Sequence, residues 1–326
     1  MSETLGDRYK EIIFKKFSDI ELIKDIESFR KNNGKLGKVL PHFFKECMFR
    51  CKGAGRVKSP LEVLNSEEDL VEILDYIKSK PNFYNYSTEA KNIESFFRNG
   101  TRFCRKVANF SPNVARDIYY RYFNSLEGVN VLDTSAGFGA RMSAVVLEGG
   151  NYLGIDPNRE LVDRLNDYKL FLERNNLVSY DQMCQFLCQG SEIYIKGLDN
   201  TFDISFTSPP YFNLEAYSND EYASTRNYND YGLWLKEFML PTLLNTVRYL
   251  KVGGYLLINI KNMTDGKKYT LFDDVFKILS NIKNLEFVER FNIDLYTPKY
   301  YYYNCGYSED EYQSYEPVMC FRKLFI

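Results

Sequence analysis

The chain has 326 residues, 44% of them apolar, which is enough for one large hydrophobic core and a smaller additional domain. Its formal net charge of −2 excludes a positive field over the whole molecule, and no run of about eighteen apolar residues is present to span a membrane. The seven cysteines include no C-x-x-C pair, which argues against a disulfide framework and predicts a cytoplasmic protein with no membrane partner.

Residues 1–109 are expected to form a helical, partly basic N-terminal domain. Apolar residues recur at helical spacing over residues 9–29 and again over 61–77. Between them, residues 31–58 hold eight Lys or Arg against a single acid, Glu46. Such a segment is either a solvated surface or a contact for phosphate groups, and the sequence leaves both open. His42, Cys47 and Cys51 lie here without a fourth ligand, so no metal site is predicted.

Residues 110–326 are expected to form a second, α/β domain. Short β-branched or apolar runs alternate with helical stretches, a pattern that predicts a doubly wound, mostly parallel seven-stranded sheet. The predicted strands are 129–132, 152–155, 184–188, 202–206, 255–260, 285–290 and 318–322. In such a sheet, ligands bind at the carboxyl ends of the strands.

A loop of small residues follows the first predicted strand. It runs from Asp133 through Ser135 to Gly137 and Gly139, and its glycines allow a tight turn and the close approach of a ligand. The loop lacks the third glycine of a dinucleotide fingerprint and the Lys-Ser/Thr of a P-loop. The second strand then ends at Asp156, whose carboxylate is placed to accept the hydroxyls of a ribose or to cap the next helix.

The fourth predicted strand runs into Thr207-Ser208-Pro209-Pro210-Tyr211. Two prolines remove two backbone donors and stiffen the loop, which leaves carbonyl groups free to point outward. A rigid loop with a free carbonyl, a small hydroxyl and an aromatic face suits an amino group on a planar base. The alternative is an ordinary turn after a strand.

Together, D-T-S-A-G-F-G, G-I-D-P and T-S-P-P-Y resemble the motifs of the amino-methyltransferases that act on adenine N6, cytosine N4 or guanine N2. The resemblance covers about residues 110–260 and implies a Rossmann-like methyltransferase fold with S-adenosyl-L-methionine as cofactor. It implies cofactor-binding roles for Phe110, Asp133, Ser135, Gly137, Gly139, Asp156 and Ser191, and catalytic roles for Ser208, Pro209, Pro210 and Tyr211. For Phe110, which precedes Ser111-Pro112, a plain helix start at that dipeptide is the alternative.

The mechanism expected from this resemblance needs no covalent intermediate. Ser208 and the Pro209 carbonyl would accept the two amine protons while Tyr211 stacks on the base. Methylation at cytosine C5 is disfavoured because no cysteine follows a proline. Ser before Pro-Pro-Tyr is more usual in cytosine N4 enzymes, whereas the order of the two motifs is usual in adenine N6 enzymes, so the base stays open.

DNA is the first expected substrate and RNA the second. The other readings are a non-catalytic nucleic-acid clamp with this fold, and methylation of a protein or small molecule. The polar and aromatic residues 217–231 predict either a loop that closes over the site or an ordinary surface loop, and the Tyr-rich residues 300–315 predict a covering loop or a recognition element. Target sequence, a companion endonuclease and oligomeric state are not predicted.

Overall fold

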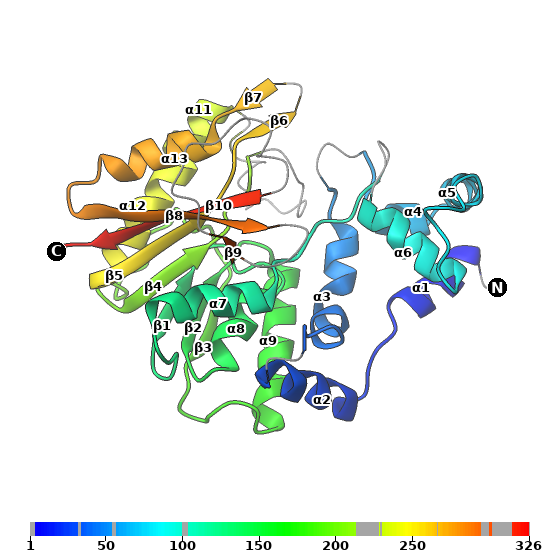
Figure 1. Ribbon diagram of the computed structural model, residues 1–326, viewed down its shortest axis with the longest axis horizontal. Coiled ribbons are helices and arrows are strands. Elements are labelled where there is room, and N and C mark those ends of the chain that lie inside the picture. The colour runs from blue at the N-terminus through cyan, green and yellow to red at the C-terminus, as the bar shows by residue number, and fades with distance from the viewer. Residues whose placement is uncertain are drawn as a thin grey trace.

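The computed structural model describes residues 4–31, 34–53, 57–99, 104–212, 228, 230–265, 267–294, 300–301 and 315–325. The loop predicted at 217–231 lies almost entirely outside these residues, as does most of the Tyr-rich segment at 300–315. Within the described part, a sheet-centred domain carries a group of helices on one side (Figure 1).

One sheet organises the C-terminal two thirds of the chain. Its order is β3-β2-β1-β4-β5-β10-β8-β9, with parallel pairing from β3 to β5 and antiparallel pairing of β10 with both β5 and β8. The strands are β1 (Asn130–Asp133), β2 (Asn151–Ile155), β3 (Cys184–Leu187), β4 (Phe202–Thr207), β5 (Leu250–Asn259), β8 (Leu285–Asp294), β9 (Tyr300–Tyr301) and β10 (Tyr315–Lys323). This confirms the predicted fold class, a doubly wound, mostly parallel sheet of the Rossmann-like methyltransferase type, to which β9 adds a short edge strand.

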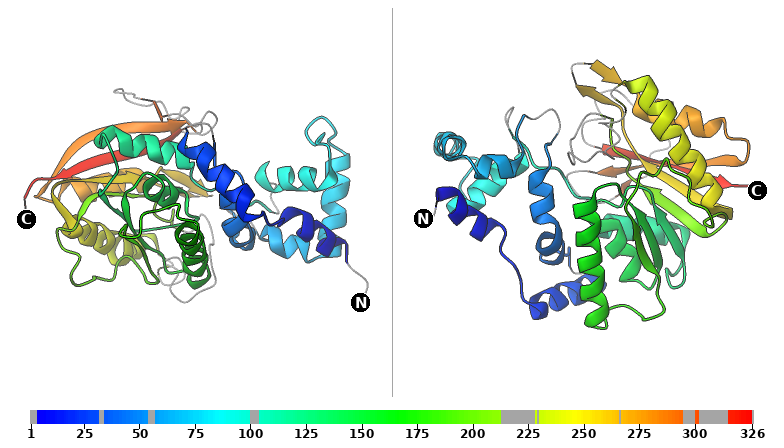
Figure 2. Two further views of the ribbon diagram at one scale, coloured as in Figure 1. Left: turned by 90° about the horizontal axis from the view of Figure 1, so that it is seen from below. Right: turned by 180° about the vertical axis from the view of Figure 1, so that it is seen from behind.

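Helices cover both faces of the sheet, because its strands carry apolar side chains on both faces. One face carries α7 (Pro112–Tyr122), α8 (Ala140–Val146) and α9 (Arg159–Arg174), and the other carries α11 (Tyr231–Trp234), the π-helix η1 (Leu235–Met239), α12 (Leu240–Tyr249) and α13 (Leu271–Ser280) (Figures 1 and 2). Residues 188–201, between β3 and β4, make turns and no helix. A small hairpin of β6 (Met263–Asp265) and β7 (Lys267–Tyr269) stands outside the main sheet.

Six helices precede the sheet domain in the described part of the chain. They are α1 (Leu5–Ile13), α2 (Asp19–Arg30), α3 (Val39–Arg50), α4 (Pro60–Leu64), α5 (Glu67–Lys78) and α6 (Glu89–Asn99). Each predicted helical stretch contains two helices, because Ser18 and Ser66 cap a new helix inside it by accepting a backbone N–H.

The N-terminal helices belong to two different cores. Helices α1, α4, α5 and α6 pack around a core of their own, which includes Phe49 and Phe97. Helix α2 instead joins the core of α7, α8 and α9, through residues such as Phe29. Helix α3 contributes to both cores, because Phe44 belongs to the core of the sheet domain and Phe49 to that of α1, α4, α5 and α6. The sheet domain therefore takes in α2 and part of α3 from the N-terminal segment. Of the described helices, none is long and apolar enough to cross a membrane.

Phe44 of α3 packs directly on the glycine loop after β1. A Cβ atom built on Gly139 would lie 2.6 Å from Phe44 Cε2, and Gly139 has a φ of 73°. Both the left-handed backbone and the ring contact therefore require glycine at this position.

Replacing Gly139 by alanine is expected to lower the free energy of unfolding by about 2–4 kcal/mol, from left-handed strain and overpacking together. The matched control is Gly128→Ala, where φ is 71° but no atom lies within 4 Å of the added Cβ. In the control, the free energy of unfolding should fall by about 1–2 kcal/mol, from the left-handed strain alone. In a Phe44→Leu background, where the ring contact is absent, Gly139→Ala should cost no more than the control does. A denaturant melt measures this cost. Equal losses in the two single variants would refute the contact.

Candidate active site at the carboxyl edge of the sheet

The predicted motifs meet at one edge of the sheet. Strands β3, β2, β1 and β4 are neighbours and run parallel, so their carboxyl ends lie side by side (Figure 1). This edge carries in order Ser191, Asp156, the loop 133–139 and the loop 208–211. The strand order reverses between β2-β1 and β4-β5, which is the switch point where doubly wound sheets bind ligands.

Asp133 lies fully buried at the end of β1 and holds the glycine loop in place. Its Oδ2 accepts from Arg141 Nε at 2.7 Å and from the Tyr152 hydroxyl at 2.8 Å, and its Oδ1 accepts from the Ser135 N–H at 3.1 Å. Arg141 also donates to the Ser135 carbonyl. All these donors come from the protein, so the carboxylate supports the loop, and its contact with a ligand stays a prediction.

The loop itself keeps polar groups available. Gly137 has a φ of 58°, and an added Cβ would meet nothing closer than 3.7 Å, so the backbone is open on this side. The buried Thr134 Oγ1 has no hydrogen-bond partner among the described residues. A buried hydroxyl without a partner is costly, and a ligand or a water molecule would satisfy it.

Asp156 stands at the tip of β2, partly buried. Its Oδ2 accepts from the Gly137 N–H at 3.2 Å and its Oδ1 from the Asn158 N–H at 3.0 Å. Burial raises the pKa of this carboxyl to about 6, and the two N–H groups oppose that rise. The helix cap of α9 is Asn158, so Asp156 is not the capping residue considered from the sequence.

The tip of β3 presents a carboxylate that the sequence did not single out. Ser191 is buried and its hydroxyl pairs with Thr242 of α12 at 3.1 Å, so its predicted ligand contact stays a prediction. The next residue, Glu192, folds back over Gly190, and its buried Oε2 has no hydrogen-bond partner in the described part of the chain. Burial raises the pKa of Glu192. No local motif marks Glu192, because the resemblance assigns the cofactor contact to the adjacent Ser191.

The loop after β4 contains two consecutive prolines and is anchored beyond its aromatic residue. Pro209 is buried, whereas Ser208, Pro210 and Tyr211 are partly exposed. No hydrogen bond within the described residues engages the Ser208 hydroxyl. Phe212 adopts a φ of 49°, unusual for a residue with a side chain, and its ring packs on Tyr231, Trp234 and Tyr269 at centroid distances of 5.4–5.8 Å. Backbone strain of this kind is concentrated at functional loops.

Phe110 lies behind the glycine loop. Its ring contacts Phe206 at 5.6 Å and lies 5.7 Å from the Arg141 guanidinium. Ser111 caps α7 and Pro112 is the first residue of that helix, so the helix start considered from the sequence is present. The cofactor contact of Phe110 stays a prediction.

The basic segment of residues 31–58 is largely neutralised. Of its seven cations that the structure describes, five pair with carboxylates: Lys38 with Glu21, Lys45 with Glu94, Arg50 with Glu46 and Glu160, Lys52 with Glu62, and Lys58 with Asp69. These ion pairs lower the net positive charge of the segment, and its contact with phosphate groups stays a prediction. No group of three or more His, Cys, Asp or Glu suited to a metal ion occurs among the described residues.

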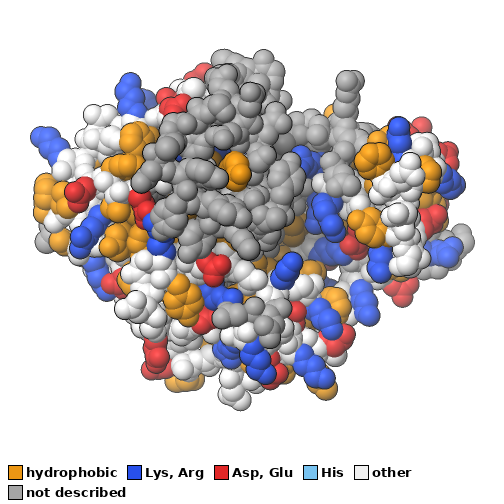
Figure 3. Space-filling model, viewed as in Figure 1, with side chains coloured by type: hydrophobic (Ala, Val, Ile, Leu, Met, Phe, Trp, Pro, Cys, Tyr) orange, Lys and Arg blue, Asp and Glu red, His pale blue; other side chains and the backbone are white. Residues whose placement is uncertain are grey.

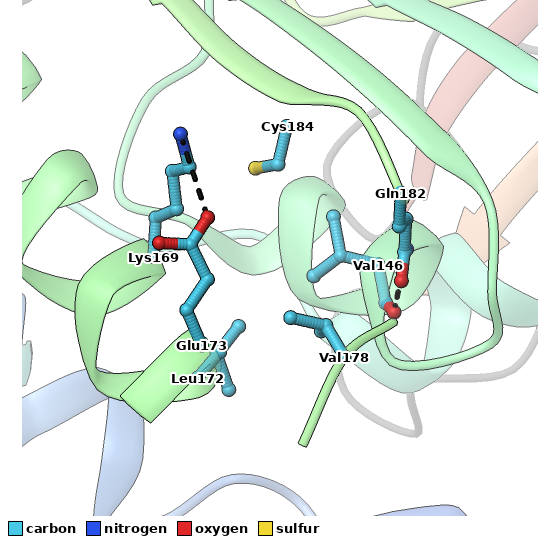
Figure 4. A pocket seen from close by; sticks show the side chains of 7 residues that line it. All are labelled: Val146, Lys169, Leu172, Glu173, Val178, Gln182 and Cys184. Carbon is cyan, nitrogen blue, oxygen red and sulfur yellow. Dashed lines mark hydrogen bonds and ion pairs between the residues drawn. The ribbon is translucent and has the colours of Figure 1, made fainter. Parts of the chain in front are cut away.

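A small hollow between α8, α9 and the start of β3 has room for about one water molecule (Figure 4). The Lys169–Glu173 ion pair and the hydrogen bond from Gln182 to the Val146 carbonyl border it. It includes Cys184, the first residue of β3, so it lies at the opposite end of that strand from the candidate site.

No protein-family model matches the chain, and no curated protein matches its sequence. Similar solved structures include a TehB-like SAM-dependent methyltransferase from Corynebacterium glutamicum (14% identity, TM-score 0.42, 78% of this chain and 99% of the other). Others are a Burkholderia thailandensis 1,6-didemethyltoxoflavin-N1-methyltransferase with bound S-adenosylhomocysteine (11%, 0.41, 80% and 91%) and a Thermotoga maritima SAM-dependent O-methyltransferase (12%, 0.40, 68% of each). These identities and TM-scores are too low to assign a substrate to this chain.

Proposed function

We propose that this protein is an S-adenosylmethionine-dependent methyltransferase that modifies the exocyclic amino group of a nucleic-acid base. The observation that carries the proposal is the convergence, at one sheet edge, of an open glycine loop, a strand-tip carboxylate and the rigid Ser208–Tyr211 loop. Each part alone is common. Their order along a switch point suits a nucleoside-containing cofactor beside a planar amine.

The residues at β1, β2 and β3 fit the cofactor. Gly137 offers an open backbone, Asp156 a carboxylate for the ribose hydroxyls, and Thr134 and Glu192 buried polar atoms that lack partners in the described structure. A positively charged sulfonium and a ribose would satisfy these groups. When bound, the cofactor supplies an electrophilic methyl group.

The loop after β4 performs the positioning. The nitrogen lone pair of a base amine is delocalised into the ring, so the amine is a poor nucleophile. Ser208 Oγ and the Pro209 carbonyl accept its two N–H hydrogens, which shifts electron density onto the nitrogen, and Tyr211 holds the ring by stacking. Rigid prolines keep these acceptors fixed during the reaction.

DNA is the proposed substrate, and RNA the second candidate. A duplex would have to extrude its base at a cost of a few kcal/mol, which stacking on Tyr211 at about 1–3 kcal/mol would partly offset. The test is transfer of labelled methyl from S-adenosylmethionine to duplex DNA, single-stranded DNA and total RNA. Label in DNA supports the proposal, label confined to RNA moves it to the second candidate, and no label in any nucleic acid despite intact cofactor binding overturns it.

Replacing Asp156 by asparagine is expected to weaken S-adenosylmethionine binding by about 10- to 100-fold, the value of a charge-assisted hydrogen bond. In the wild-type protein, affinity should fall as the pH drops through about 6, because the protonated carboxyl loses acceptor capacity. The variant should show no such fall. Calorimetric titrations between about pH 7.5 and about pH 5 measure both effects. Asp199→Asn, in an exposed ion pair with Arg248, is the control, and equal pH dependence in all three proteins would contradict the assignment.

A further inference from the structure

Two cations near the end of α6 differ from the paired cations of the basic segment. The Lys106 N–H donates to the Phe97 carbonyl at 2.9 Å, which places Lys106 beside Arg98 at the end of α6. No carboxylate of the described residues lies within ion-pair distance of Arg98 or Lys106. Lys45 of α3 is a third neighbour, and it forms an ion pair with Glu94 at 2.6 Å.

This arrangement is unfavourable for the protein on its own. Lys106 is partly buried, and burial together with the like charges of Arg98 and Lys45 lowers its pKa. A lysine that is desolvated among cations destabilises the folded protein at neutral pH. A bound anion would compensate this cost, whereas a purely structural position would favour an uncharged residue.

The cluster borders the candidate active site. Residues 106–109 span at most about 10 Å, and Asn109 Nδ2 donates to the Phe138 carbonyl in the glycine loop at 3.1 Å. Phe44, which precedes Lys45, packs on Gly139 in the same loop. Figure 3 shows Lys and Arg side chains gathered where the N-terminal helices meet the sheet domain.

We propose that Arg98 and Lys106, with Lys45 beside them, bind the phosphodiester backbone of the nucleic-acid substrate next to the candidate active site. The inference rests on the proposed function and adds the surface that holds the strand. It would give a chain of net charge −2 a local positive surface for a polyanion.

The test compares Arg98→Gln/Lys106→Met with Lys38→Gln/Lys52→Gln. Both double variants remove two positive charges from the N-terminal helices and the segment next to them, but the control removes cations that are already ion-paired. Fluorescence anisotropy with duplex DNA, single-stranded DNA and single-stranded RNA over a salt series measures affinity and its salt dependence. The cluster variant is expected to bind about tenfold more weakly and to lose about 1.8 from the duplex salt slope, or about 1.4 from the single-strand slope.

The control should retain the wild-type slope, and both variants should retain cofactor affinity. Lys106→Met should melt at or above the wild-type temperature, since it keeps the apolar stem and removes a desolvated charge. If it melts earlier, Arg98→Gln alone, at an exposed position, should still show about half the change in slope. Equal slopes for cluster variant and control, with methyl transfer to nucleic acid intact, would overturn the cluster only. A wild-type protein that binds the cofactor but methylates no nucleic acid would overturn the proposed function and this inference together.

Discussion

Replacing Arg141 by methionine is expected to lower the free energy of unfolding by about 3–5 kcal/mol. Arg141 and Asp133 form an ion pair at 2.7 Å with exposed side-chain fractions of 6% and 0%. Methionine fills much of the space but leaves the Asp133 carboxylate buried without a counter-charge. It also removes the bond to the Ser135 carbonyl, so the glycine loop should loosen and cofactor affinity should fall as well.

Denaturant melts of four variants, Arg141→Met, Arg248→Met, Asp133→Asn and the double variant Asp133→Asn/Arg141→Met, test this expectation. Arg248→Met breaks an exposed pair with Asp199 at 2.9 Å and should leave the free energy of unfolding nearly unchanged, because solvent screens that pair. The double variant Asp133→Asn/Arg141→Met should be less destabilised than the sum of its single changes, because no buried charge remains. A loss for Arg141→Met no larger than that for Arg248→Met would show that the buried pair does not hold the loop.

Replacing Tyr211 by alanine is expected to lower kcat/KM for methyl transfer by about 10- to 100-fold, the equivalent of about 1–3 kcal/mol of base stacking. S-adenosylmethionine affinity should stay nearly unchanged, because the proposal places the ring against the base and not against the cofactor. Steady-state methyl transfer and calorimetric cofactor binding measure the two quantities separately.

Tyr211→Phe is the matched control, since it keeps the ring and removes only the hydroxyl. It should retain most of the activity. Parallel losses of transfer and cofactor affinity in Tyr211→Ala would place the ring at the cofactor instead. Loss of activity in Tyr211→Phe equal to that in the alanine variant would assign the role to the hydroxyl group.

The sheet was predictable because its strands are short apolar or β-branched runs set between helical patterns. The boundaries of β1 (Asn130–Asp133) and β2 (Asn151–Ile155) differ from the predicted ranges by one residue. The N-terminal helices were harder to predict from the sequence, because Ser18 and Ser66 interrupt a continuous apolar period by capping new helices. The packing of α2 and α3 against the core of the sheet domain depends on tertiary contacts, and no local sequence pattern indicates it.

The candidate site was predictable where its chemistry lies in contiguous motifs, as at Gly137 and Ser208. The partner of Asp133 was not, because Arg141 reaches it only through the path of the loop and the first turn of α8. The neutralised basic segment shows the same limit. Glu94 and Glu160, which pair with Lys45 and Arg50, are distant in sequence, so a local charge count overstated the field.

The most direct test of the central claim is the position of the methyl group in nucleosides recovered after incubation of the wild-type protein with S-adenosylmethionine and nucleic acid. The proposed site predicts methylation of an exocyclic nitrogen, such as N6-methyladenine or N4-methylcytosine, and its loss with Tyr211→Ala. Methyl groups on a ring carbon or a ribose hydroxyl, or no transfer despite intact cofactor binding, would contradict it.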